Sequence, residues 1–310
     1  MSAGPVATFD AHSPEARAIA TLFTQTLIIC GVIAVVVTAL VVYCIFRFRE
    51  KPGDAEPKQI HGHTQLEVTW TLIPLAIVVG IFVLTLRAMA DGDPPSEGAP
   101  DLVITGHQWW WEARYSSGAI TANEIHIPVG KKLLVRIEAA DVIHDFWVPQ
   151  LGRKIDAVPG HSSTIWLEAD AAGQYLGACA EYCGAQHAWM RIVVVAEPQA
   201  EFDAWEAHQR EPAPKPSGEQ ATRGAKVFAD RTCIKCHAIS GSGEQPRVAP
   251  DLTHLAQRTT LGAGVMLNTK TDLARWLRDP QAIKPGSYMP NVQLSPSEVD
   301  DLVAYFETLK

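Results

Sequence analysis

The chain has 310 residues, of which 19% are charged and 47% hydrophobic, and its formal net charge is −8 at pH 7. A chain of this length is expected to form about two folded units, and so apolar a composition excludes an intrinsically disordered protein. The acidic net charge argues against nucleic acid as a partner.

Two long apolar segments near the N-terminus, residues 22–46 and 68–89, predict membrane-spanning helices. About 20 consecutive apolar residues are enough to cross a bilayer. Pro74 and Gly80 lie within the second segment, and membrane helices tolerate these residues better than soluble helices do. The sequence therefore predicts a two-helix transmembrane hairpin over residues 22–90.

The charges around these segments predict the orientation of the hairpin. The loop between them is basic and the flank after the second is acidic, and a basic excess marks the cytoplasmic side. Both termini are then expected outside, with residues 1–21 as an outward segment. The alternative is an uncleaved signal peptide, which Asp10, Glu15 and the lack of a basic start disfavour. The basic residues of the loop are Arg47, Arg49, Lys51 and Lys58.

Residues 91–210 predict an all-β domain. Short runs of β-favouring residues recur there, and this spacing indicates a β-sandwich or barrel. A short helix is expected at 199–210, where Phe202 and Trp205 are the large apolar residues of a polar segment. The β-favouring runs are 102–104, 125–129, 133–137, 164–167 and 192–195.

The loop before the last of these runs carries metal-binding residue types. Cys179, Cys183, His187 and Met190 supply thiolate, imidazole and thioether groups, which favour a copper electron-transfer site over Mg or Ca. The alternative interpretation is a disulfide with an incidental histidine and methionine.

One loop cannot close such a metal site, so a further imidazole is expected from an earlier loop. His144, in the segment Asp141-Val-Ile-His144, lies between strand-like runs and is the best candidate. By their context, His126 and His161 are weaker candidates.

Residues 211–218 are Pro-rich and predict a linker between domains. Residues 91–210 carry 8 basic and 17 acidic residues, a net charge of −9, whereas residues 219–310 carry 11 and 10, a net charge of +1. An acidic domain attracts a cationic one. Because the linker tethers the two, effective concentration is expected to dominate their encounter.

Residues 219–310 predict a helical domain that carries haem. Cys233, Cys236 and His237 form the C-x-x-C-H signature of covalent c-type haem attachment, in which the imidazole binds the iron. The alternative is a zinc site that adds His254 to these three residues. Ser295-Pro-Ser-Glu298 predicts a capping box at the start of the last helix.

The second axial ligand of the haem is expected to be a thioether, because a thioether raises the haem potential. Met289, which precedes a proline, is expected in this role rather than Met266. The order of features over 219–310 resembles class I cytochrome c. Pro250 resembles the proline whose carbonyl orients the proximal imidazole of that family.

The β-domain motifs Asp141-Val-Ile-His144, Cys179 to Met190 and Gln108 to Glu112 resemble subunit II of the haem-copper cytochrome c oxidases. The resemblance implies a cupredoxin-like Greek-key fold and a dinuclear copper centre, CuA. Two thiolates shared by two coppers spread one electron over both, and rigid strands beneath the loop hold that geometry. The implied ligands are Cys179 and Cys183 as bridges, His144 and Met190 on one copper, and His187 and the backbone carbonyl of Glu181 on the other.

The resemblance also implies roles for other residues. Trp109 matches the residue through which electrons reach the copper, and a structural aromatic of the β-domain is the alternative. Glu67 matches a proton-uptake carboxylate at the start of the second span, and a merely solvated carboxylate is the alternative. The side chain of Glu181 matches a Mg ligand at the boundary with subunit I, and Lys154 and Asp156 match a segment that contacts subunit I.

On this resemblance the chain is expected to be the electron-input subunit of a caa-type cytochrome c oxidase, an oxidoreductase coupled to proton translocation. Electrons would come from an upstream cytochrome or bc-type complex to haem c, and pass through CuA to the oxygen site in subunit I. The expected location is the bacterial inner membrane, with both redox domains on the periplasmic side, in complex with subunit I and other oxidase subunits.

Other classes of function stay open as alternatives. The first is the CuA electron-input subunit of a membrane nitric oxide reductase, which the identity of the partner would decide. A nitrous oxide reductase would carry a propeller domain, which the sequence lacks. A copper-storage protein has no use for a fused haem, and a quinol oxidase subunit II lacks the copper ligands found here.

Overall fold

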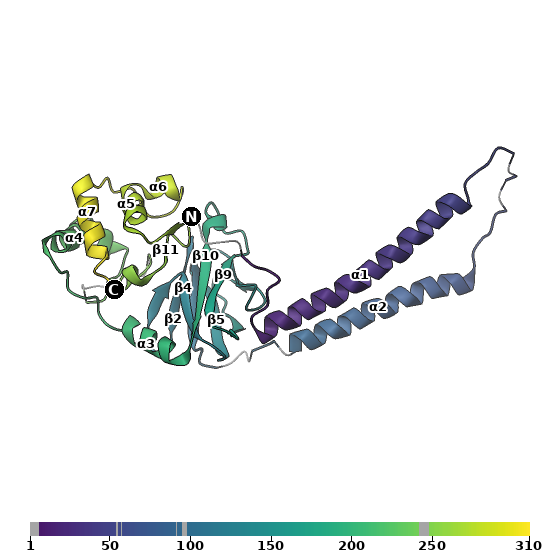
Figure 1. Cartoon of the computed structure of the whole chain (residues 1–310), viewed down its shortest axis with the longest axis horizontal. Helices are drawn as coiled ribbons and strands as arrows, with labels where there is room; N and C mark the ends of the chain where they lie inside the picture. The colour runs from purple at the N-terminus through teal and green to yellow at the C-terminus, as the bar shows by residue number, and fades with distance from the viewer. Residues whose placement is uncertain (1–5, 54, 57, 91, 95–97, 242–247) are drawn as a thin grey trace. The chain divides into compact units, whose positions relative to one another are not determined.

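The computed structural model describes residues 6–310 apart from 54, 57, 91, 95–97 and 242–247 (Figure 1). The chain divides into two compact units. The smaller unit comprises residues 17–93, and the larger joins the residues up to Ala16 with residues 94–310.

Two long helices, α1 (Pro14–Arg47) and α2 (Thr64–Ala90), account for most of the smaller unit. Both are long and apolar enough to cross a membrane, and their large apolar side chains are exposed. Helix α1 begins before the predicted residue 22 because Ser13 accepts a hydrogen bond from the N–H of Ala16 and Pro14 follows it, a favoured helix start.

Strands of the larger unit form a two-sheet sandwich. In chain order these strands are β1 (Leu102–His107), β2 (Trp110–Tyr115), β3 (Ile120–Ala122), β4 (Glu124–Pro128), β5 (Leu133–Ala139), β6 (His144–Trp147), β7 (Ile155–Ala157), β8 (Ser163–Leu167), β9 (Gly173–Cys179) and β10 (Arg191–Glu197). One sheet has the order β3-β2-β1-β5-β8 and the other β4-β10-β9-β6-β7. Each sheet contains one parallel pair, β1 with β5 and β4 with β10.

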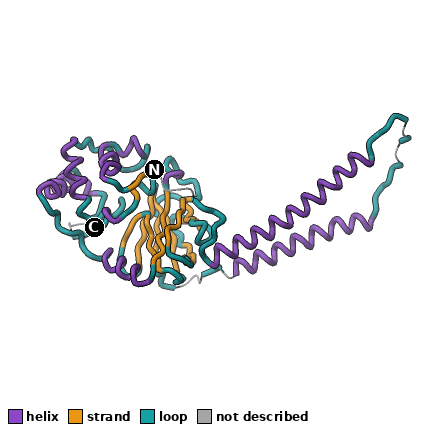
Figure 2. Tube along the Cα trace, in the orientation of Figure 1, coloured by secondary structure: helices purple, strands orange, loops and turns teal. Residues whose placement is uncertain are grey.

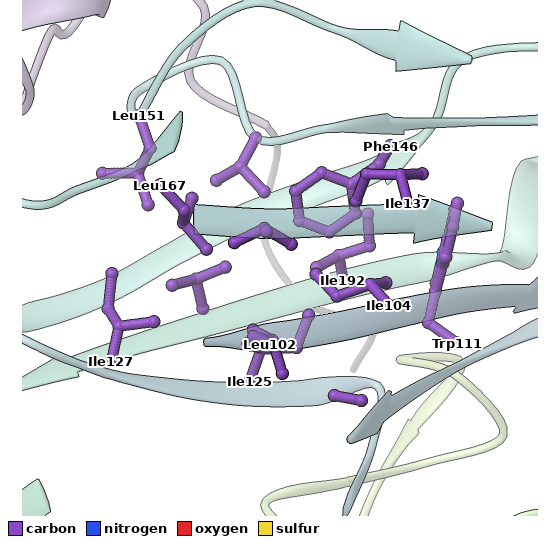
Figure 3. Close-up of a cluster of buried hydrophobic side chains, with 14 of the residues drawn as sticks. Leu102, Ile104, Trp111, Ile125, Ile127, Ile137, Phe146, Leu151, Leu167 and Ile192 are labelled. Carbon is purple, nitrogen blue, oxygen red and sulfur yellow. The ribbon is translucent and has the colours of Figure 1, made fainter. Parts of the chain in front are cut away.

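Apolar side chains from both sheets meet in the core of the sandwich (Figure 3). In β1, Leu102 and Ile104 are buried and the residues between them are less so, as the period of two in a strand requires. Phe146 of β6 and Ile192 of β10 enter the same core from the second sheet. Burying one such side chain stabilises the fold by about 1.5–3 kcal/mol. The core therefore holds the strand ends, and the loops that leave them, in fixed positions.

The five predicted β-runs all overlap strands, but β2, β3, β6, β7 and β9 were not predicted. In β2 nearly every residue is buried, which removes the alternation by which a strand is recognised. Strand β9 contains glycines, and Gly177 is needed there because an added Cβ would clash with the backbone carbonyl of Trp147. The predicted short helix is present as α3 (Gln199–Gln209).

The C-terminal part of the larger unit is mainly helical, as predicted, and Figure 2 shows its helices gathered apart from the two sheets of the sandwich. At Gly224 an added Cβ would clash with the backbone carbonyl of Asp301, so a glycine is needed where α4 and α7 cross. The capping box of Ser295 and Glu298 begins α7 as predicted. The elements are α4 (Glu219–Asp230), α5 (Lys270–Arg278), α6 (Pro280–Ile283), α7 (Pro296–Phe306), β11 (Thr260–Leu261), β12 (Met266–Leu267) and 3-10 turns at Cys233–Lys235 and Leu255–Gln257.

Candidate metal and haem sites

The loop between β9 and β10 gathers the soft ligand types around two sulfur atoms. The N–H of Cys179 donates to the carbonyl oxygen of Met190 at 2.9 Å and closes the base of the loop. The Sγ atoms of Cys179 and Cys183 lie 3.8 Å apart. Nδ1 of His187 lies 3.6 Å and Sδ of Met190 3.8 Å from the Cys183 sulfur. The carbonyl oxygen of Glu181 lies 3.2 Å from the Cys179 sulfur.

His144 reaches this loop from the first residue of β6, which pairs with β9. Its Nδ1 lies 4.0 Å from the Cys179 sulfur, and its Nε2 lies 2.8 Å from Oδ1 of Asp141. A carboxylate on one ring nitrogen holds the imidazole in the tautomer whose other nitrogen is free to bind metal. Within the described residues, His144, Cys179 and Cys183 are the one group of at least three His, Cys, Asp or Glu residues whose ligand atoms lie within 4.8 Å of one another.

Asp141 and His144 stabilise each other's charged form. Burial alone raises the pKa of Asp141, but hydrogen bonds from His144 and from the backbone N–H groups of Gln108 and Val142 lower it overall. Burial alone lowers the pKa of His144, but its hydrogen bonds with Asp141 and Cys179 raise it overall. Asp141 is therefore a carboxylate that holds the imidazole in place.

The two thiols of the loop also shift each other's ionisation. The hydrogen bond between the two sulfur atoms is the main reason why the pKa of Cys179 is lowered, and the same contact raises the pKa of Cys183. Their separation of 3.8 Å far exceeds the disulfide bond length of about 2.05 Å, and both are free cysteines. Two thiols, one imidazole and a thioether of this set are buried and the imidazole of His187 is half-buried, and such a set fits copper, whereas Mg and Ca prefer oxygen ligands.

Trp109 lies in the turn between β1 and β2 and contacts the same loop. Its indole Nε1 donates to the carbonyl oxygen of Cys183 at 2.9 Å, and Nε2 of Gln108 donates to that oxygen at 2.8 Å. The next loop residue, Gly184, has φ +113°, and an added Cβ there would lie 3.0 Å from the Trp109 ring. Glycine thus allows the indole to approach the loop closely.

The neighbouring tryptophans have structural roles. Trp111 is fully buried in the sandwich core. Trp110 stacks on His107, with ring centroids 4.2 Å apart. Among the described contacts of Trp109, Trp110 and Trp111, only the side chain of Trp109 forms a hydrogen bond with the loop between β9 and β10, residues 180–190, which is called the copper-type loop below.

A cavity in the helical part lies beside the C-x-x-C-H signature. Cys233, Cys236 and His237 line it, and so does Met289 from the segment before α7. Nδ1 of His237 lies 2.8 Å from the carbonyl oxygen of Pro250, which is the contact expected for that proline. Burial lowers the pKa of His237 and so favours the neutral imidazole, the form that binds iron.

The two candidate methionines differ in their surroundings. Nε1 of Trp276 donates to Sδ of Met289 at 3.1 Å, at the wall of the cavity. Met266 is packed in the apolar core of the helical part and is not among the described residues that line the cavity. This arrangement favours Met289 as the axial ligand.

The other candidate histidines lie outside both sites. Each ring nitrogen of His254 lies within 3.2 Å of a backbone carbonyl oxygen, which leaves no nitrogen for a zinc site with the signature. Nδ1 of His126 lies 3.2 Å from Oε1 of Glu197, and the ring stacks on Trp205. His161 is exposed in the turn before β8.

The carboxylates that the resemblance singled out, Glu67, Glu181 and Asp156, lie at a helix start, at the surface and in a strand. Oε1 of Glu67 accepts a hydrogen bond from the N–H of His63 at 3.1 Å, at the start of α2. The side chain of Glu181 is exposed, and Asp156 of β7 lies opposite Asp145 of β6. Burial, with a hydrogen bond to Asp156, raises the pKa of Asp145 to about 7. The proton and Mg roles of these carboxylates stay predictions.

Two residues near the sites were not predicted from the sequence. Asp141 stands three positions before His144, and that spacing was a usable signal for a carboxylate that orients a histidine. Nothing in the sequence around Lys284 indicated that its side chain is buried or what it contacts. Its Nζ donates at 2.9 Å to each of three backbone carbonyl oxygens, those of Trp109, Trp189 and Gly262.

Comparison with known proteins gives three family matches, which follow one another along the chain. The transmembrane domain of cytochrome c oxidase subunit II matches residues 5–88, its periplasmic domain matches 117–197, and cytochrome c matches 221–310. Cytochrome c oxidase subunit 2 of Alkalihalophilus pseudofirmus is 39% identical, over 97% of this chain and 90% of that protein. The proteins of the same name from Bacillus sp. and Bacillus subtilis are each 33% identical, over 85% and 86% of this chain and 80% and 82% of theirs.

Proposed function

The chain belongs to the cytochrome c oxidase subunit II family, and from this premise we propose that it passes electrons from its own haem c to a CuA centre and on to subunit I of a haem-copper oxidase. It is a membrane protein with a periplasmic domain and a component of an oxidoreductase. The family implies copper, and the cytochrome c domain implies haem.

Each group is assigned to side chains that already lie together. We assign the copper pair to Cys179, Cys183, His144, His187, Met190 and the carbonyl of Glu181. We assign the haem to Cys233, Cys236, His237 and Met289. When bound, the copper pair would take up and release one electron, and so would the haem.

The observation that carries the proposal is the position of Trp109. Its indole donates to the carbonyl of the ligand residue Cys183, and Trp109 is also among the residues that line the cavity beside His237 and Met289. One side chain therefore touches both candidate sites, which supports a direct route for electrons between them.

The proposed topology has both termini and both redox domains on the periplasmic side of a bacterial inner membrane. Ser13, at the start of α1, donates from Oγ to the carbonyl oxygen of Leu151 at 2.8 Å, and the N–H of His12 donates to that of Gln150 at 2.8 Å. These bonds hold the segment before α1 on the β-domain and support an outward N-terminus. Proton uptake at Glu67, a Mg ion at Glu181 and an upstream cytochrome or bc-type donor are proposed from the family resemblance alone.

The test of the proposal is spectroscopic. The full chain, purified with its haem and supplied with copper, is expected to contain two coppers per haem and to show one unpaired electron shared by both coppers. His144→Ala should abolish the near-infrared band of the mixed-valence pair, and His161→Ala is the matched control that should retain it. A His144→Ala variant with the band intact would refute the ligand assignment.

The terminal acceptor is tested on the assembled complex. Membranes that contain the complex are expected to consume oxygen with reduced cytochrome as donor, and the rate should fall to background in the His144→Ala variant. Consumption of nitric oxide instead of oxygen would assign the chain to a nitric oxide reductase.

A further inference from the structure

Two buried side chains with ionisable groups join the β-domain and the helical domain. One extends from the helical domain into the β-domain, and the other extends from the β-domain into the helical domain. Both domains, residues 102–197 and 219–310, belong to the larger compact unit. Lys284 of the helical domain is 3% exposed, and Glu124 of the β-domain is 4% exposed. A buried charge is tolerated only where polar partners surround it. The partners of these two residues therefore indicate which arrangement of the two domains is stable.

Lys284 enters the β-domain next to the copper-type loop. Its ammonium group donates to the carbonyl oxygens of Trp109 and Trp189 there, and to that of Gly262 in its own domain. Burial lowers the pKa of Lys284 to about 7. The three acceptors are all satisfied only by the protonated amine, because a neutral amine can donate two hydrogen bonds at most.

Glu124, the first residue of β4, enters the helical domain. Its Oε1 accepts hydrogen bonds from the backbone N–H and the hydroxyl of Thr259, at 2.8 and 2.9 Å. The N–H and hydroxyl of Thr260 donate to the same oxygen at 2.9 and 3.2 Å. Four donors from one short segment of the helical domain therefore converge on one oxygen of a buried carboxylate.

Weaker contacts lie around these two charges. Oη of Tyr288 donates to Oε1 of Gln108 at 2.6 Å, and the Tyr288 ring lies 5.5 Å from the Trp109 ring. The N–H of Arg191 donates to the carbonyl oxygen of Ala263 at 3.1 Å. Trp110 packs on Ala263. The interface therefore includes the turn that holds Trp109 and the segment that leads to Met289.

We infer that Lys284 and Glu124 hold the helical domain on the β-domain in one register, with the haem cavity against Trp109, so that the fused domain is a permanently docked electron donor. A shift of either domain would leave one charge buried without its backbone partners, and that cost specifies the register. The docking inference stands on the contacts alone, and only its consequence for electron transfer rests on the proposed function.

Lys284 is a positioning residue in this arrangement. It donates to the carbonyl of Trp109, whose indole donates to the carbonyl of Cys183, and Met289 follows Lys284 by five positions. Trp109 is only 7% exposed. The helical domain therefore leaves little of the Trp109 side chain accessible to any other protein.

The first test measures docking without reference to activity. In the full haem- and copper-loaded chain, amide hydrogen exchange is followed at Thr259 and Thr260, whose N–H groups bond Glu124. Lys284→Met is expected to speed their exchange by about tenfold or more, although Lys284 does not bond them, because loss of hydrogen bonds to a charged group shifts an equilibrium by at least that factor. Lys270→Met, at a lysine whose side chain is 74% exposed, is the matched control and should change nothing.

The second test uses Glu124 and electron transfer. Glu124→Leu is expected to speed exchange at Arg191, and both variants should slow electron transfer from haem to copper by about tenfold or more after flash reduction of the haem. The haem and copper spectra should stay as in the parent chain. Unchanged exchange and unchanged transfer rates in Lys284→Met would overturn the docking inference.

Two further outcomes are distinguishable. If Lys284→Met does not retain haem and copper, Lys284→Gln replaces it, and parent-like exchange in that variant would equally overturn the inference. If the parent chain lacks a dinuclear copper signal but the exchange results hold, the proposed function fails and the docking of the domains stands.

Discussion

The indole Nε1 of Trp109 donates a hydrogen bond to the backbone carbonyl oxygen of Cys183, at 2.9 Å. Trp109 is in the turn between β1 and β2 of one sheet, and Cys183 is in the loop after β9 of the other. The bond therefore joins the two sheets at the edge where the candidate copper ligands lie, and it fixes the indole ring relative to the residue that carries the Cys183 thiol.

Trp109→Phe keeps an aromatic ring and removes the N–H donor. We expect the copper and haem spectra to be retained and electron transfer from haem to copper to slow by about tenfold or more, because small displacements of reacting groups reduce rates strongly. Flash reduction of the haem, followed at the near-infrared copper band, measures this rate. Trp205→Phe on α3 is the control, and a parent-like rate in Trp109→Phe would show that the indole bond is irrelevant to transfer.

Asp141→Asn removes the carboxylate that orients His144. The asparagine amide has the same size as the carboxylate, but it carries no charge to hold the His144 imidazole in its metal-binding tautomer. Loss of such a partner typically weakens metal binding by about 10–100-fold. Competition with a copper chelator measures the affinity. Asp203→Asn, at an exposed carboxylate of α3, should leave the affinity unchanged. Equal affinities in both variants would mean that Asp141 does not support the ligand.

Met289→Ala and Met266→Ala separate the two candidate haem ligands. Met289→Ala should leave the haem attached through Cys233 and Cys236 but lower its midpoint potential, because a thioether raises that potential. Met266→Ala should leave the potential unchanged and destabilise the domain by about 2–5 kcal/mol, because it opens a cavity in the core. Redox titration and thermal unfolding measure the two effects, and the reverse pattern would assign the iron to Met266.

The lowered pKa of Glu298 predicts that this residue stabilises the fold at neutral pH but not in acid. Hydrogen bonds from Arg231 and Ser295 lower the pKa of Glu298 from its ordinary value of 4.5 to about 2. Because the folded pKa is the lower one, the contribution is complete above about pH 4.5 and is lost as the pH falls toward 2. Glu298→Gln should lower the Tm at pH 7, and the difference should shrink below pH 4.5. Asp300→Asn is the control, and a difference that is independent of pH would contradict the assignment.

The sequence by itself was enough to predict the chemistry of both candidate sites and the fold class of each segment. Cys179, Cys183, His187 and Met190 fall within one loop, and Cys233, Cys236 and His237 within one turn, so their residue types and spacing predict copper and haem chemistry. The spans and the last helix were predictable for a similar reason, since apolar length and a capping box are local patterns. Strand β2 was not, because a strand buried on both faces shows no alternation.

Only the tertiary structure decided which distant residues meet. The sequence predicted that His144 joins the cysteine loop, but the pairing of β6 with β9 that brings it there and the packing that brings Lys284 to Trp109 come from the fold. These positions are set by strand register and by the burial of charges against backbone groups of another segment. Backbone carbonyls have no sequence signature, and so the position of the haem domain on Trp109 follows from the fold and not from any motif.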